Sequence, residues 1–117
     1  MSRALVIVDH GSVRPEAHAH LLWISEQVKE RAPELRVYIA HMELAEPSIE
    51  AAIDAAVHDA ASEILVHPLF LVPGRHLTQD IPALIQQASQ RHPALRIQMT
   101  DALGSVPELA DVILRTL

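Results

Sequence analysis

The chain has 117 residues, of which half are hydrophobic and 21% are charged, and its formal net charge is -6. This length and balance predict one globular domain over residues 1–117 and exclude a disordered or collagen-like chain. The chain contains no cysteine, so disulfides, thiolate metal sites and cysteine nucleophiles are excluded. The negative net charge argues against nucleic-acid binding, which needs clustered lysine and arginine.

The first predicted element is a strand over residues 3–8, a continuous run of mostly aliphatic side chains. Such a run is typical of a strand that is buried on both faces. Asp9 and His10 end it, and it is too short for a signal sequence or a membrane span. We therefore expect a cytoplasmic protein that does not associate with membranes.

Three further elements follow in the first half of the chain. Pro15 opens a helix that ends before Pro33, and Ser12 is its predicted cap. Residues 35–40 form a second predicted strand. Residues 49–60 carry one apolar stripe at helical spacing, which predicts an amphipathic helix.

The second half of the chain repeats this alternation. A strand is predicted over residues 63–67, because Pro68 cannot donate to a sheet. Thr78 is a predicted cap for the next helix, which is followed by a strand over residues 95–99. Ser105 and Pro107 then open the last predicted helix.

Four strands alternating with four helices predict an α/β fold. Right-handed crossovers would give a flavodoxin-like three-layer parallel sheet, with helices on both faces. We expect the strand order 2-1-3-4. In such sheets ligands bind beyond the carboxyl ends of the strands, where the strand order reverses.

Residues able to bind a metal follow the predicted strands at this carboxyl edge. His10 follows the first strand, Glu43 follows the second, and Arg75 and His76 lie in the segment after the third. Two imidazoles and a carboxylate suit Co²⁺, Ni²⁺, Fe²⁺ or Zn²⁺ in a site with open coordination positions. On spacing alone, His10 can also be a turn residue, His76 a solvated loop residue and Glu43 a partner of a helix dipole.

The other histidines have weaker claims to a role in such a site. His18 and His20 lie two positions apart on a predicted helix, so they cannot chelate one ion together and are expected at the surface. His67 is expected to be buried and hydrogen-bonded. His41 lies close enough to the edge to contact a metal ligand without binding the metal itself.

Three motifs carry a resemblance to a known family. They are His10-Gly11-Ser12, residues 43–49 (ELAEPSI), and residues 68–76 (PLFLVPGRH) followed by residues 80–82 (DIP). In this order they resemble the short form of the CbiX family of class II chelatases, over essentially the whole chain. Members of this family insert Co²⁺ into sirohydrochlorin on the anaerobic cobalamin route, and close relatives insert Ni²⁺ or Fe²⁺.

The resemblance implies a sirohydrochlorin cobaltochelatase with half of the chelatase fold. A homodimer is expected, because longer relatives contain two such halves in one chain. The metal-binding histidines of the family correspond to His10 and His76, which would hold Co²⁺ and accept pyrrole protons, assisted by Glu43. Co²⁺ is then a substrate, and no organic cofactor is implied.

The tetrapyrrole carries many carboxylates, so a net-acidic protein must bind it through local groups. Arg14 and Arg75 lie beside the predicted edge, and Ser12 and the amide of Gly11 lie in the turn after the first strand. Charged and amide donors of this kind bind carboxylates. These residues are the predicted anchors of the substrate.

Alternative functions are open at this point. Imidazole ligands accept all three metals, so a sirohydrochlorin nickelochelatase or ferrochelatase, on the coenzyme F430 or siroheme route, is also possible. A non-catalytic metal carrier would use the same ligands. A phospho-acceptor signalling module needs an aspartate after the third strand, where this chain has His67 and Pro68.

Overall fold

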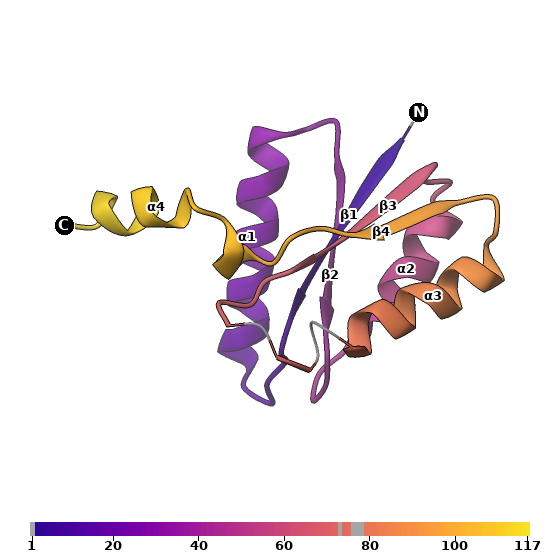
Figure 1. The fold of residues 1–117 in the computed structure, drawn as a ribbon, viewed down its shortest axis with the longest axis horizontal. Helices are drawn as coiled ribbons and strands as arrows, with labels where there is room; N and C mark the ends of the chain where they lie inside the picture. Colours follow the sequence, from indigo (N-terminus) through magenta and orange to yellow (C-terminus); the bar gives the residue numbers. More distant parts are fainter. Residues whose placement is uncertain (1, 73, 76–78) are drawn as a thin grey trace.

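Four strands form one parallel sheet of order β2-β1-β3-β4 in a computed structural model that describes residues 2–72, 74–75 and 79–117 (Figure 1). The predicted topology is therefore confirmed. The elements are β1 (Arg3–Asp9), α1 (Pro15–Arg31), β2 (Arg36–His41), α2 (Ile49–His58), β3 (Glu63–Pro68), α3 (Ile81–Arg91), β4 (Arg96–Met99), the 3-10 helix η2 (Leu103–Ser105) and α4 (Leu109–Arg115). None of the described helices has the length and apolar character of a membrane span.

The main core lies between the sheet and the helices α2 and α3. Alternate side chains of β1 are fully buried on this face, because neighbouring residues of a strand point to opposite sides. Ile64 and Val66 of β3 join them. The helix residues packed against these strands are Ile49, Ala52, Ile53, Ala56, Ile81, Ile85 and Ala88.

The opposite face of the sheet is covered by α1, which Figure 1 shows on the other side from α2 and α3. Ile7 of β1 and Leu21 of α1 are buried there. Helices on both faces were predicted, and α1, α2 and α3 confirm this. The helix α4 differs, because it extends past α1 away from the sheet and none of its residues is buried.

The caps of the helices differ more from expectation than the strands do. The Ser12 hydroxyl accepts a hydrogen bond from the Arg14 N–H at 3.0 Å, but Arg14 itself occupies the N-cap position, so Ser12 shapes the preceding turn. Thr78 lies outside the described residues. The last helix begins at Leu109 rather than at Pro107, since Pro107 and Glu108 form a turn between η2 and the helix.

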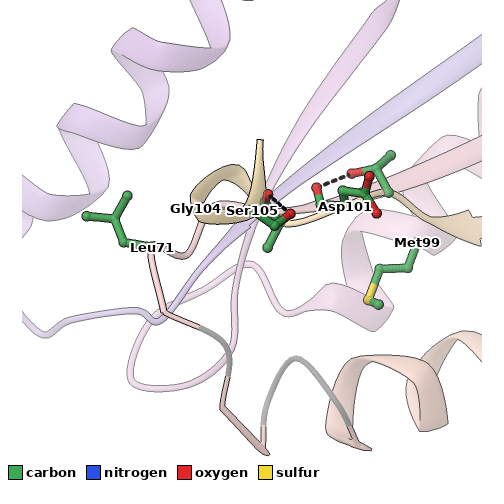
Figure 2. Close-up of a pocket in the computed structure, with 7 residues that line it drawn as sticks. Leu71, Met99, Asp101, Gly104 and Ser105 are labelled. Carbon is green, nitrogen blue, oxygen red and sulfur yellow. Dashed lines mark hydrogen bonds between the residues drawn. The ribbon is translucent and has the colours of Figure 1, made fainter. Parts of the chain in front are cut away.

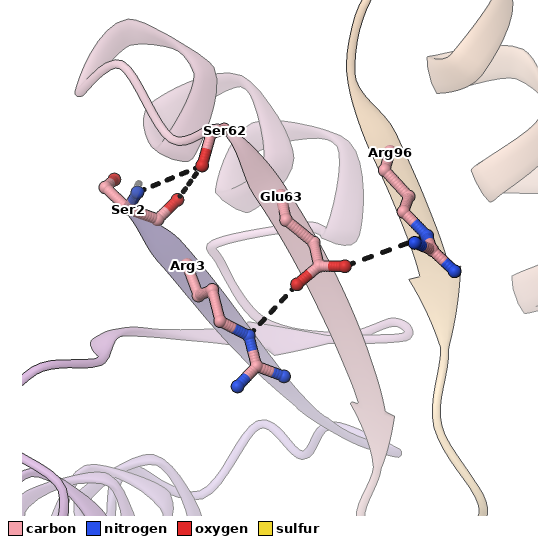
Figure 3. Close-up of polar contacts among 5 residues, drawn as sticks. All are labelled: Ser2, Arg3, Ser62, Glu63 and Arg96. Atoms are coloured by element: carbon pink, nitrogen blue, oxygen red, sulfur yellow. Dashed lines mark hydrogen bonds and ion pairs between the residues drawn. The ribbon is translucent and has the colours of Figure 1, made fainter.

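The amino edge of the sheet is tied by polar contacts across three strands (Figure 3). Glu63 of β3 forms ion pairs with Arg3 at 3.0 Å and with Arg96 at 3.7 Å, as the strand register places both arginines beside it. Ser2 and Ser62 exchange hydrogen bonds at 2.9 and 2.8 Å. Exposed ion pairs contribute little stability each, and these contacts lie at the end of the strands opposite the predicted site.

Candidate active site

The carboxyl edge presents the imidazole of His10 on an aromatic support. His10 follows the last residue of β1 and is exposed. Its ring stacks on Phe70, with the ring centroids 4.2 Å apart and the planes 15° from parallel. Phe70 is only 3% exposed and lies just after β3, so the segment following the third strand fixes the face of the His10 ring.

Glu43 lies against the turn that carries His10. The strands β1 and β2 continue their approach beyond the sheet, since the Met42 N–H donates to the Asp9 carbonyl at 2.9 Å and the Glu43 N–H donates to the His10 carbonyl at 3.2 Å. The side chain of Glu43 is exposed. The predicted juxtaposition of His10 and Glu43 is thus present in the backbone.

Gly11 makes this close approach possible. Its φ is +92°, a conformation that side chains with a Cβ rarely adopt. A Cβ added at this position would stand 1.8 Å from the carbonyl oxygen of Glu43. The glycine of the His-Gly-Ser motif therefore lets the two loops touch and holds His10 beside Glu43.

The predicted substrate anchors line one side of this edge. Ser12 and Arg14 border a pocket of about 390 Å³, together with His18 and Glu46. Arg14 is exposed, and Arg75, on the segment after β3, is exposed as well. The structure leaves both guanidinium groups accessible to an anionic ligand.

A chain of hydrogen bonds runs behind this pocket. His41, only 1% exposed, places its Nδ1 at 2.5 Å from a carboxylate oxygen of Asp9 and its Nε2 at 2.9 Å from Nδ1 of His18. An ionised carboxylate can only accept, so Nδ1 of His41 donates to it; with His41 neutral, its Nε2 accepts from His18. The chain joins the ends of β1 and β2 to the first turns of α1.

The expectation for His18 is wrong, and that for His41 was incomplete. His18 was expected at the surface, but it is half-buried because its ring points at His41. One signal was present in the sequence: in a parallel pair with this register, Asp9 and His41 stand side by side at the strand ends. The expected hydrogen bond of His67 is confirmed, since its Nδ1 lies 2.9 Å from the Thr100 hydroxyl, although the side chain is half-buried rather than fully buried.

A second pocket, of about 430 Å³, lies at the carboxyl end of β4 and was not predicted (Figure 2). Figure 2 shows Leu71 on one side of it and Met99 and Asp101 on the other. The Gly104 N–H donates to the Phe70 carbonyl at 2.9 Å, and a Cβ at Gly104 would stand 1.9 Å from the Leu71 carbonyl oxygen. This pocket therefore adjoins the segment that supports His10.

The predicted metal ligands are only partly described. His76 lies outside the described residues, so its position relative to His10 stays a prediction. Among the residues that the structure does describe, no group of three His, Asp or Glu side chains could hold a metal ion. The described part of the site thus consists of one supported imidazole, an adjacent carboxylate and two accessible arginines.

The fold and this edge define an α/β protein with its candidate ligand site at the point where the strand order reverses. The CbiX family model matches residues 4–117, so the chain belongs to the CbiX family. This assignment agrees with the resemblance carried by the three sequence motifs.

Two named relatives match most of the chain. A chloroplastic sirohydrochlorin ferrochelatase from Arabidopsis thaliana is 40% identical over 109 residues, which are 93% of this chain and 48% of the relative. A sirohydrochlorin cobaltochelatase from Methanocaldococcus jannaschii is 42% identical over 89 residues, which are 76% of this chain and 62% of the relative. This chain thus spans about half of the first protein and less than two thirds of the second.

A solved structure agrees with the fold. The sirohydrochlorin chelatase SirB from Bacillus subtilis subspecies spizizenii, in complex with cobalt, superposes with a TM-score of 0.86 at 31% identity. The match covers 98% of this chain and 49% of SirB. The chain is therefore similar in structure to one half of that protein.

Proposed function

We propose that this protein is a sirohydrochlorin chelatase that inserts Co²⁺ into the macrocycle. The observation that carries the proposal is the exposed His10 imidazole, supported by Phe70 and placed beside Glu43, in a chain that matches the CbiX family over residues 4–117. The names of the two curated relatives support the substrate. Co²⁺ is proposed from the resemblance to the short form of the family; the relatives include a cobaltochelatase at 42% identity and a ferrochelatase at 40% identity, so the choice of metal rests on the assay below.

The residues of the edge suit the chemistry of metal insertion. The incoming ion must lose water, and two pyrrole N–H groups must release their protons as the metal binds their nitrogens. His10 and His76 supply neutral imidazole nitrogens, which bind borderline divalent ions and leave positions open for the macrocycle. Glu43 assists by accepting a proton near the metal.

The substrate carboxylates require donors around this centre. Arg14 provides an exposed guanidinium group shortly after β1, and Arg75 provides a second one on the segment after β3. The Ser12 hydroxyl oxygen accepts a hydrogen bond from the backbone N–H of Arg14. The O–H of Ser12 therefore remains able to donate to a carboxylate of the substrate. The amide of Gly11 lies in the same turn and completes the proposed anchors.

A homodimer would complete the site. The macrocycle is too large for the pockets of one edge, and this chain matches only half of the relative from Arabidopsis and half of SirB. Two copies related by a two-fold axis would supply His10 and His76 twice around one cavity. We propose this arrangement for the working enzyme.

Anaerobic metal insertion tests the proposed function. Purified protein is mixed with sirohydrochlorin and Co²⁺, Ni²⁺ or Fe²⁺ in parallel, and the absorbance shift of metallation is followed against a protein-free reaction. We expect insertion to be accelerated, most strongly with Co²⁺. Metal binding without acceleration for any ion would instead indicate a metal carrier, and faster insertion of Ni²⁺ or Fe²⁺ would reassign the metal.

A further inference from the structure

A pocket of about 390 Å³ lies beside the turn that carries His10, and one imidazole lines it. Ser12, two residues after His10, is part of its lining. Leu44, which directly follows Glu43, is another part. His18 of α1 contributes the imidazole. The pocket therefore adjoins the proposed site of metal insertion, and the function proposed above assigns no role to this histidine.

The hydrogen bonds behind His18 determine which of its ring nitrogens carries a proton. The Asp9 carboxylate accepts from Nδ1 of His41, so Nε2 of neutral His41 carries a lone pair. That nitrogen accepts from Nδ1 of His18 at 2.9 Å. Nε2 of neutral His18 then carries a lone pair as well. No described residue bonds to it, so this nitrogen is left to a group in the pocket.

The same hydrogen bonds stabilise a proton that arrives at Nε2 of His18. The imidazolium form still donates from Nδ1 to His41, and a charged donor makes a stronger hydrogen bond than a neutral one. His41 is held as an acceptor by Asp9 and is only 1% exposed, so water competes little for the contact. A base that is oriented by a third group is the arrangement found in acid–base catalysis.

Three charged groups of the described chain face His18 across the pocket or through His41. Arg14, at the N-cap of α1, and Glu46, in the segment after β2, line the pocket. Asp9 of β1 lies behind His41. Two carboxylates, one guanidinium and an imidazolium at His18 together have no net charge. The pocket can therefore hold the extra proton without an uncompensated charge.

A proton suits this nitrogen better than a metal ion or an anion does. Within the described part of the chain no three His, Asp or Glu side chains could hold a metal, and the Arg14 guanidinium repels cations. A lone pair cannot donate to a carboxylate, so Nε2 of His18 is not an anion site. Ser12 and Arg14, the proposed anchors of a substrate carboxylate, line the same pocket and would bring the macrocycle toward His18.

The proposed metal insertion leaves one proton without an acceptor. Two pyrrole N–H bonds must break, and the electron pair of each then forms a bond from nitrogen to the metal. Glu43 takes one of the two protons in the function proposed above. His10 and His76 take neither while they bind the metal, because a neutral imidazole has one nitrogen lone pair and the metal uses it.

We propose that Nε2 of His18 accepts the second pyrrole proton, with His41 and Asp9 as positioning residues. The pyrrole N–H bond breaks, its electron pair forms the bond to the metal, and the proton moves to Nε2 directly or through one water. His18 is half-buried, so the proton can pass on to solvent from the pocket. This inference rests on the proposed chelatase function and adds a residue to it.

His18→Gln tests the role, because a glutamine amide can still donate to His41 but cannot take up the proton. We expect kcat for Co²⁺ insertion to fall at least about tenfold, as the loss of a general base does. The KM for sirohydrochlorin should stay unchanged, and so should the Kd for Co²⁺, measured by calorimetry without the macrocycle. His20→Gln, at an exposed position of the same helix, is the matched control and should keep the wild-type kcat.

The dependence of kcat on pH separates a proton acceptor from a structural role. In the wild type, kcat should fall from pH 8 to pH 6, because imidazole takes up a proton in this range and then no longer acts as a base. His18→Gln should show a smaller fall over the same range, and His20→Gln should show the wild-type fall. An equal fall in all three proteins would overturn the role of His18.

Nuclear magnetic resonance tests the geometry without a variant and without activity. Long-range ¹H–¹⁵N spectra of the wild type at pH 8 should show the proton of His18 on Nδ1 and a lone pair on Nε2. A proton on Nε2 would overturn the proposal, because that nitrogen could then accept nothing from the substrate.

The kinetic outcomes separate this role from the proposed function. A raised KM for sirohydrochlorin with unchanged kcat would make His18 a substrate anchor, and a raised Kd for Co²⁺ would make it a metal ligand. Either result, or a wild-type kcat in His18→Gln, would overturn the role of His18 and leave the chelatase function intact. A wild type that accelerates insertion of no metal would overturn the function itself, and this role with it.

Discussion

The ring of His10 lies nearly parallel on the ring of Phe70, with 4.2 Å between the centroids. One residue follows β1 and the other follows β3, so the contact joins the ends of two neighbouring strands. The buried phenyl ring fixes the plane of an exposed imidazole. A proposed metal ligand is thereby held in one orientation before any ion arrives.

Removal of the proposed ligands should slow metal insertion. We expect His10→Ala and His76→Ala each to lower the insertion rate by at least about tenfold, as the loss of a ligand or proton acceptor does. The measurement is the anaerobic absorbance assay with Co²⁺. His58→Ala, at the exposed end of α2, serves as the control. Unchanged rates in both variants would remove these histidines from the mechanism.

Loss of the aromatic support should affect activity more than stability. Phe70→Leu keeps an apolar side chain but removes the stacking, which is worth about 1 kcal/mol. We expect a small loss of unfolding free energy in urea and a several-fold slower insertion. Ile64→Val removes a methylene from the core away from the edge, at a similar cost of about 1 kcal/mol. If the two variants had equal rates, the orienting role of Phe70 would be wrong.

Gly11 should not tolerate a side chain. Gly11→Ala combines a φ of +92° with a Cβ 1.8 Å from the Glu43 carbonyl oxygen, so the two loops must separate. We expect a loss of about 2 kcal/mol of unfolding free energy and a lower insertion rate. At Gly74 an added Cβ meets no atom within 4 Å, so Gly74→Ala should change the unfolding free energy by less than about 0.5 kcal/mol. Equal stability of the two variants would contradict this interpretation.

The buried His41 should be needed for folding. His41→Asn removes the ring that connects Asp9 to His18 and leaves their polar atoms without that partner. We expect a loss of about 2 kcal/mol, measured by thermal and urea unfolding. His58→Asn changes an exposed histidine and should have little effect. A stable His41→Asn protein would show that the hydrogen-bonded chain contributes little.

The stability should depend on pH through His67. Burial lowers the pKa of His67 below its usual value of 6.5, so the unfolded chain binds a proton more readily than the folded one. Stability from this group is therefore complete above the unfolded pKa and is lost as the pH falls toward the lowered folded pKa. His67→Gln should lose less unfolding free energy between pH 7.5 and pH 5 than the wild type does. An identical loss in both proteins would exclude His67 as the source.

The alternation of apolar runs predicted a parallel α/β sheet and the placement of His10 and Glu43 at its carboxyl edge. Both follow from strand periodicity and from the rule that parallel strands end at one edge, so they need no knowledge of side-chain packing. The motif His10-Gly11-Ser12 likewise indicated a tight turn. Its glycine is explained by the Glu43 carbonyl, which only the tertiary structure places against it.

Other features depended on how the elements pack. The hydrogen bond between His18 and His41 depends on how α1 lies across the ends of β1 and β2. Helical spacing predicts which face of a helix carries a residue, but it does not predict which residue of another element lies opposite that face. The apolar stripe of α4 predicted an amphipathic helix, yet an apolar stripe can pack on any apolar surface. Its position away from the sheet was therefore decided only by the tertiary structure.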